Sequence, residues 1–143
     1  MKRDHQLFVK DIIAAMKAIE QFAEGLSLNE FKDDDRTSSA VIRKFEIIGE
    51  ATKYIPESVK GTYPEVPWKR MAGMRDRLIH AYFGIDYQLV WAAIQREIPE
   101  LKPRLEKILT ELQKSKTQSC AISFLALLAA PALLNGATPF NRV

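Results

Sequence analysis

The fold class is indicated first by the stretch Val9-Lys-Asp-Ile-Ile-Ala-Ala-Met-Lys-Ala-Ile-Glu-Gln-Phe-Ala23. Its apolar residues recur at the three- and four-residue spacing that places side chains on one face of an α-helix. The residues of this stripe are Val9, Ile12, Met16, Ile19 and Ala23. Gly25 follows and suits the left-handed cap that ends many helices. The stretch therefore predicts an amphipathic helix with one buried face.

Helical spacing continues on the carboxyl-terminal side of this stretch. Ser27 and Glu30 form the pattern of a capping box. The run Asp33 to Asp35 favours the positive start of a further helix, which ends before Pro56. The apolar stripe of that helix consists of Val41, Phe45, Ile48 and Ala51. One more turn is expected from Pro56 to Lys60, stopped by Gly61.

The second half of the chain predicts two or three more helices. Pro67 suits the first position of a helix over about Trp68 to Ala81, and Gly84 marks its exit. Asp86 is a candidate cap for the next helix. The inward-facing residues expected there are Tyr87, Trp91, Ile94 and Ile98, followed by Leu101, Leu105, Ile108 and Leu112 in a last helix.

Between these two stripes, either Pro99 breaks the chain or Pro103 sits in the first turn of the last helix. No convincing alternating strand pattern, internal repeat or low-complexity tract is present. The sequence therefore predicts an all-α, antiparallel up-and-down helical bundle with short loops.

Composition sets outer limits on function. A chain of 143 residues fits one domain, and its net charge of +3 is compatible with an RNA partner without arguing for one. Cys120, the only cysteine, excludes an internal disulfide and a cysteine-based metal cluster. A reducing cytoplasm fits this usage, and the amphipathic start of the chain predicts no signal peptide.

The carboxyl-terminal end has a composition of its own. From Thr117 to Val143 the only charged residue is Arg142, and the apolar run Ala121 to Leu134 is shorter than the roughly 20 residues that span a bilayer. We expect a helical domain over residues 1–116 and an apolar extension over 117–143, with no membrane partner. The extension is a docked helix, a partner-binding tail or a disordered end.

Chemistry is concentrated in Met71-Ala-Gly-Met-Arg-Asp-Arg-Leu-Ile-His-Ala-Tyr-Phe-Gly84. Arg75 can hold a phosphate through its planar guanidinium, and His80 can transfer a proton near neutral pH. Asp76 lies four residues before His80, so on a helix it can orient the imidazole and raise its pKa. Together these residues suggest cleavage of a phosphodiester, with His80 as acid or base and Arg75 stabilising the developing charge.

Arg75 and His80 lie about 140° apart on an ideal helix, so one straight helix cannot bring both to the same phosphate. Either the helix ends near His80, or two copies of the chain face each other across a symmetric dimer. We expect no metal site, because His5 and His80 are the only histidines and lie far apart in the sequence.

Structural roles compete with these catalytic ones. Arg75 could instead form a salt bridge with a neighbouring helix, for instance with Glu46 or Glu50. Tyr82 could be an aromatic residue at the edge of the core. The face formed by Met71, Met74 and Leu78 is expected to pack in the bundle or a dimer, and Trp68 and Trp91 are expected to be core residues.

The spacing Arg75-x4-His80-x-Tyr82 resembles the signature of HepT-like toxins, a branch of the HEPN ribonuclease superfamily. The resemblance extends over about Arg3 to Leu112. It is carried also by Ala40-Val-Ile-Arg-Lys-Phe-Glu-Ile-Ile-Gly-Glu-Ala51, Tyr63-Pro-Glu-Val-Pro-Trp68, Tyr82-Phe-Gly-Ile-Asp86 and Val90-Trp91.

The resemblance implies a helical homodimer whose facing motif helices form an RNase cleft, without a cofactor. It further implies the toxin of a type VII toxin–antitoxin system, with Arg75 and His80 catalytic. The cognate minimal nucleotidyltransferase antitoxin would transfer AMP to Tyr82. The family often has asparagine where this chain has Asp76, which leaves the supporting role of that residue open. The competing function is a non-catalytic nucleotide-binding or protein-interaction module.

Overall fold

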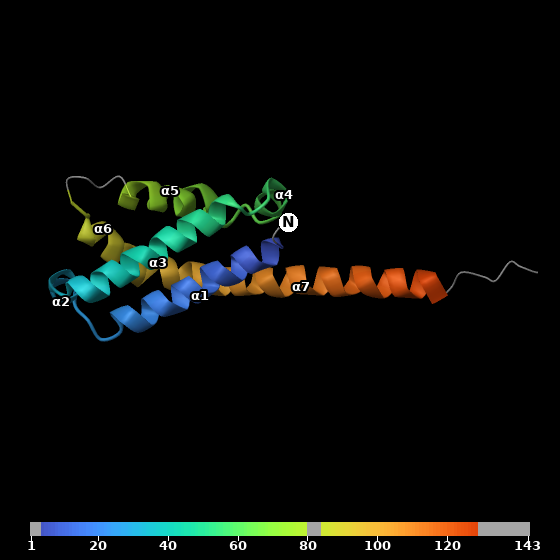
Figure 1. The fold of residues 1–143 in the computed structure, drawn as a ribbon, viewed down its shortest axis with the longest axis horizontal. Coiled ribbons are helices and arrows are strands. Elements are labelled where there is room, and N and C mark those ends of the chain that lie inside the picture. Colours follow the sequence, from blue (N-terminus) through green and yellow to red (C-terminus); the bar gives the residue numbers. More distant parts are fainter. Residues whose placement is uncertain (1–3, 80–83, 129–143) are drawn as a thin grey trace, which may run out of the picture.

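A computed structural model describes residues 4–79 and 84–128, and within these ranges the chain is helical with no strand. This confirms the all-α class predicted from the periodicity (Figure 1). The elements are α1 (His5–Ala23), α2 (Leu28–Asp33), α3 (Asp35–Lys53), α4 (Glu57–Thr62), α5 (Trp68–Ile79), α6 (Tyr87–Ala92), the π-helical turn η1 (Ala93–Glu97) and α7 (Ile98–Leu128).

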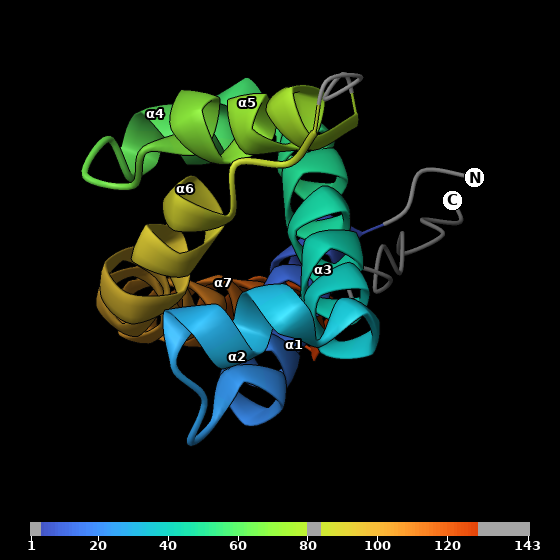
Figure 2. The same ribbon diagram turned by 90° about the vertical axis from the view of Figure 1, so that its left-hand side faces the viewer.

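The core forms around α1, which packs against both α3 and α7. All five residues of its predicted stripe are buried, and so are the four predicted for α3. Helix α5 packs along α3, on the other side of α3 from α1 (Figures 1 and 2). Helix α3 is therefore the element through which α5 is held to the rest of the molecule.

The predicted helix signals at three loops are confirmed. Ser27 and Glu30 form both hydrogen bonds of a capping box. Asp34 accepts a hydrogen bond from the Thr37 backbone N–H at the start of α3. Asp86 does the same for Leu89 at the start of α6. These caps satisfy backbone donors that a helix leaves unpaired in its first turn.

Two predicted helix boundaries are wrong. Gly61 does not stop α4 but lies inside it, one residue before its end at Thr62, where the helical penalty for glycine has little leverage. Pro99 does not break the chain, and Pro103 lies inside α7 rather than in its first turn. In η1 the N–H of Ile98 donates to the carbonyl of Ala93, five residues back, and this wider turn accommodates the ring of Pro99.

Helix α7 leaves the bundle after its buried residues Ile98, Leu101, Leu105 and Ile108. It is fastened to the start of α1 by Lys116, whose Nζ lies 2.7 Å from Asp4 Oδ2. Beyond this bridge α7 continues as an exposed helix that projects from the other elements (Figure 1). Its exposed residues include Cys120, Ile122, Phe124, Leu125, Leu127 and Leu128.

The first twelve residues of the predicted extension are thus a continuation of α7 that does not dock on the bundle, and residues 129–143 lie outside the described ranges. Within the described part of the chain, no helix is both long and apolar enough to cross a bilayer.

Candidate functional site

Helix α5 carries the motif on one side and core residues on the other. Met71 is buried, and Met74 and Leu78 pack partly buried against the core, as the helical wheel predicts. Trp68 is also buried, and its indole N–H donates to the carbonyl of Tyr63 at 2.9 Å. These buried and partly buried residues fix the rotation of α5 about its axis, and Arg75 lies at the edge of the buried face, in contact with α3.

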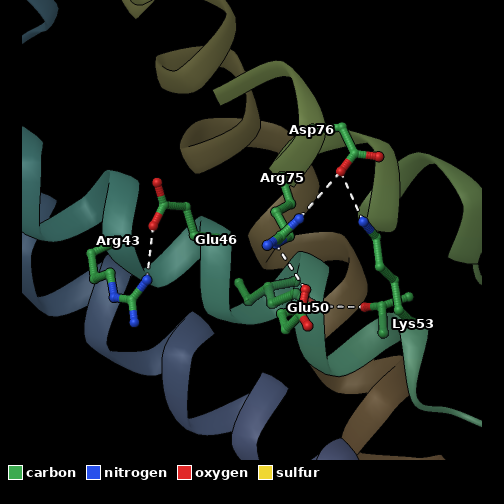
Figure 3. A network of polar contacts seen from close by, with 8 residues as sticks. Arg43, Glu46, Glu50, Lys53, Arg75 and Asp76 are labelled. Atoms are coloured by element: carbon green, nitrogen blue, oxygen red, sulfur yellow. Dashed lines mark hydrogen bonds and ion pairs between the residues drawn. The ribbon is translucent and has the colours of Figure 1, made fainter. Parts of the chain in front are cut away.

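Arg75 contacts two carboxylates (Figure 3). Its Nε lies 2.8 Å from Glu50 Oε2 on α3, and its Nη1 lies 3.5 Å from Oδ1 of the adjacent Asp76. The side chain of Arg75 is 30% exposed and that of Glu50 is 44% exposed. Of the two predicted salt-bridge partners, Glu50 is therefore the one used, while Glu46 pairs with Arg43 on its own helix.

Asp76 is held by Lys53, whose Nζ donates to Asp76 Oδ1 at 2.8 Å. The hydrogen bond from Lys53, with the nearby charge of Arg75, keeps the pKa of Asp76 below its ordinary value. Asp76 is therefore an anion at neutral pH, available to stabilise a neighbouring cation. The predicted contact between Asp76 and His80 cannot be placed, because His80 and Tyr82 lie outside the described residues.

Gly49 is part of the site although the sequence reading did not single it out. A Cβ added at Gly49 would lie 2.4 Å from the Cβ of Arg75 and 3.2 Å from the carbonyl oxygen of Met71. Only a residue without a side chain allows α3 and α5 to approach this closely. The available signal was a glycine interrupting an otherwise apolar and charged helical pattern.

A groove of about 390 Å³ opens beside Arg75, between α1, α3 and α5. Besides Arg75 and Glu50, its lining includes Ile79 and the ring pair Phe8 and Tyr54, which stack with centroids 5.3 Å apart. The lining carries both acidic and basic side chains. Arg75 is therefore a cation held in place by Glu50 in a groove that is not uniformly basic. It can hold an anion at Arg75 against a partly apolar surface.

A larger groove of about 1010 Å³ lies between α5 and the η1–α7 segment, and Arg75 is not part of it. Its floor includes Phe45, Ile48 and Leu101, and its rim includes Lys69 and Arg77. Neither groove contains a metal centre that the structure identifies, since the described residues include no group of three His, Cys, Asp or Glu residues suited to a metal ion.

Known proteins are similar to this chain over the region that contains α3 and α5. A family model described as "Ribonuclease HepT-like" matches residues 12–108. A protein of Thermococcus cleftensis named "Probable ribonuclease HepT" is 47% identical over 108 residues, which are 76% of this chain and 98% of the relative.

Two proteins of Methanocaldococcus jannaschii, whose names provisionally assign them as RNases, are also similar. One is 45% identical over 79% of this chain and 97% of its own length, and the other is 44% identical over 78% and 93%. No solved structure gave a significant match. The matched region contains Gly49, Glu50 and the whole of α5. The chain belongs to the HepT-like ribonuclease family.

Proposed function

We propose that the chain is a metal-independent RNA endonuclease, the toxin of a type VII toxin–antitoxin system acting in the cytoplasm. The observation that supports this most is Arg75, an arginine that lines the groove between α1, α3 and α5 and is held there by Glu50. Family membership supplies the reaction class, since relatives that this chain matches over nearly their whole length are named as ribonucleases.

In the proposed mechanism, the guanidinium of Arg75 stabilises the negative charge that develops on the phosphate during cleavage. His80 removes the proton of the 2′-hydroxyl or protonates the leaving 5′-oxygen. The anionic Asp76 supports the charged form of His80. In a symmetric homodimer the facing α5 helices would bring Arg75 of one copy and His80 of the other to one RNA strand.

We also propose that a cognate minimal nucleotidyltransferase antitoxin inactivates the enzyme by transferring AMP from ATP to the hydroxyl of Tyr82, with release of pyrophosphate. The adenylate, two residues after His80 in the sequence, would add a phosphate that competes with RNA for Arg75 and bulk that blocks the cleft. Intact-mass measurement after co-expression should show added AMP units that are absent from a Tyr82→Phe chain. An unmodified wild-type chain beside an active antitoxin would contradict this part of the proposal.

The test of the catalytic proposal is RNA cleavage by the full chain in EDTA. Arg75→Ala and His80→Ala should each lose about 10²-fold or more in rate while keeping the helical circular dichroism of the wild type. Arg104→Ala is the matched control, because it removes a more exposed arginine that pairs with Glu100 on its own helix and does not line the groove beside Arg75. Full activity in both motif variants would refute the assignment.

One observation keeps a second function in view. Glu50 and Asp76 both contact Arg75, so part of the charge that a phosphate would meet is already balanced. A non-catalytic module that binds a nucleotide or a protein at this groove would tolerate that balance. It predicts saturable nucleotide or antitoxin binding that depends on Arg75, with no RNA cleavage at any enzyme concentration.

A further inference from the structure

We infer that Glu50 is a positioning residue that sets the direction of the Arg75 guanidinium toward RNA. The inference rests on the proposed RNase function and adds to it a residue on another helix. The inference is supported by the geometry of the α3–α5 contact. Gly49 of α3 contacts the backbone and Cβ of Arg75, and the next residue, Glu50, holds its side chain.

The contact to Glu50 uses the inner donor of the guanidinium. Glu50 Oε2 accepts from Nε of Arg75 at 2.8 Å, and Nε is the nitrogen closest to the backbone. The other carboxylate contact of Arg75 is made by a terminal nitrogen, Nη1, which lies 3.5 Å from Asp76 Oδ1 (Figure 3). Terminal nitrogens are the donors that a phosphate oxygen reaches most easily from solvent. The contact of Glu50 therefore restrains the rotamer of Arg75 through Nε and not through a terminal nitrogen.

Gly49 makes this restraint rigid. Because the two helices touch at the Cβ of Arg75, the Cα of Arg75 has little freedom to move relative to α3. Glu50 follows immediately on the same helix, and Lys53, almost one turn later, holds Asp76. One turn of α3 thus positions both Arg75 and Asp76.

A comparison within the molecule separates this pair from an ordinary surface ion pair. Arg43 and Glu46 form an equally short contact of 2.9 Å, but both belong to α3 and 71% of the Arg43 side chain is exposed. Such pairs contribute little to stability and constrain no second element. The Glu50–Arg75 pair joins two helices, and its arginine is 30% exposed. Glu46 itself lines the groove beside Arg75, so the control for Glu50 is Glu106. Glu106 is 43% exposed, pairs with Lys17 of another helix and does not line that groove.

The charge of Glu50 works against RNA binding while its position favours catalysis. A carboxylate 2.8 Å from Arg75 lowers the positive potential that attracts phosphate. If Glu50 acts by orientation, removing it should slow the chemical step without weakening RNA binding. A merely structural residue would give no such separation between kcat and KM.

The experiment measures kcat and KM on one RNA substrate for the wild type, Glu50→Ala, Glu50→Gln and Glu106→Ala. We expect Glu50→Ala to lower kcat about tenfold with KM unchanged or lower, because a misdirected guanidinium loses its near-attack geometry. Glu50→Gln keeps an acceptor oxygen and should retain kcat within about threefold. Glu106→Ala should match the wild type, and adding Glu50→Ala to Arg75→Ala should cause no further loss.

A Glu50→Ala enzyme with wild-type kcat would overturn the inference, and so would an equal loss in the Arg75→Ala background. Either result would leave the RNase proposal intact, provided that Arg75→Ala alone is inactive. A second readout does not need activity: the NMR signal of the Arg75 Nε–H should exchange slowly with water in the wild type and Glu50→Gln, and rapidly in Glu50→Ala. If the wild type does not cleave RNA, the proposed function fails, and a signal indifferent to Glu50 then refutes the positioning role as well.

Discussion

Gly49 is the position where a single methyl group has the largest predicted consequence. Gly49→Ala would place a Cβ within 2.4 Å of the Arg75 Cβ, so α3 and α5 must separate. Overpacking of this kind costs about 1–3 kcal/mol. We expect urea unfolding to report a loss of that size, together with lower RNase activity because Arg75 moves.

Gly73→Ala provides the control for that experiment. Gly73 lies on α5, and a Cβ there would meet no atom within 4 Å. Alanine is the better helix former by up to about 1 kcal/mol, so this variant should be as stable as the wild type or more so. Equal stability changes in the two glycine variants would show that helix propensity, and not the contact with Arg75, governs position 49.

At single residues, sequence reasoning reached the type of contact but not its geometry. It named Glu46 and Glu50 as possible partners of Arg75 on a neighbouring helix and did not choose between them. The choice between them depends on the crossing of α3 and α5, which Gly49 sets. The pairing of Asp76 with Lys53 was missed for the same reason, since it joins residues that are 23 positions apart.

At the level of helices, periodicity predicted what was buried better than where a helix ends. The stripes of α1 and α3 are buried as expected, and so is that of α7 up to Ile108, with Leu112 partly buried. A 3.6-residue repeat is a property of the segment itself. The helix break expected at Pro99 is wrong because η1 relieves the clash of the proline ring with the preceding turn. This irregular turn has no distinct sequence pattern. A rule for a single residue, such as the helix-breaking effect of proline, therefore fails where a neighbouring irregular turn removes the clash on which the rule is based.

Removal of residues 117–143 tests whether the exposed end of α7 supports the bundle. Residues 117–128 are exposed, and Lys116 retains its bridge to Asp4 in the shortened chain. We expect the free energy of unfolding to change by less than about 0.5 kcal/mol, as for other surface changes. Thermal and urea unfolding measure this directly, and RNase activity should persist. A loss above about 1 kcal/mol would mean that this segment packs against something in solution.

For the molecule as a whole, its carboxylates make folding sensitive to acid. In four of them, hydrogen bonds keep the pKa below the ordinary value. Lys116 donates to Asp4, Ser27 donates to Glu30, Thr37 donates to Asp34, and Lys53 donates to Asp76. A lowered folded pKa gives stabilisation that is complete above the unfolded value, here 3.8 for aspartate and 4.5 for glutamate, and is lost as pH falls through the folded value.

The urea midpoint should therefore be nearly constant from pH 7 to about 5 and fall progressively below about 4.5. Asp76→Asn should reduce the steepness of that fall, because one of the groups that take up protons on unfolding is gone. Midpoints that rise on acidification to pH 4 would contradict the assigned directions of the pKa shifts.

At the scale of the assembly, the feature to be tested is the oligomeric state. The all-helical class follows from periodicity, whereas the symmetric dimer belongs to the proposed mechanism. Its test is a solution mass twice that of the 16.3 kDa chain.

The lone thiol on the projecting part of α7 offers a direct route to that question. Cys120 is exposed and has no competitor in the sequence, so a nitroxide label attached to it would sit at one defined point on each copy of the unaltered chain. Dipolar spectroscopy between two such labels would then yield an inter-subunit distance distribution. These distances distinguish a dimer in which the two projecting α7 helices run side by side from one in which they point apart.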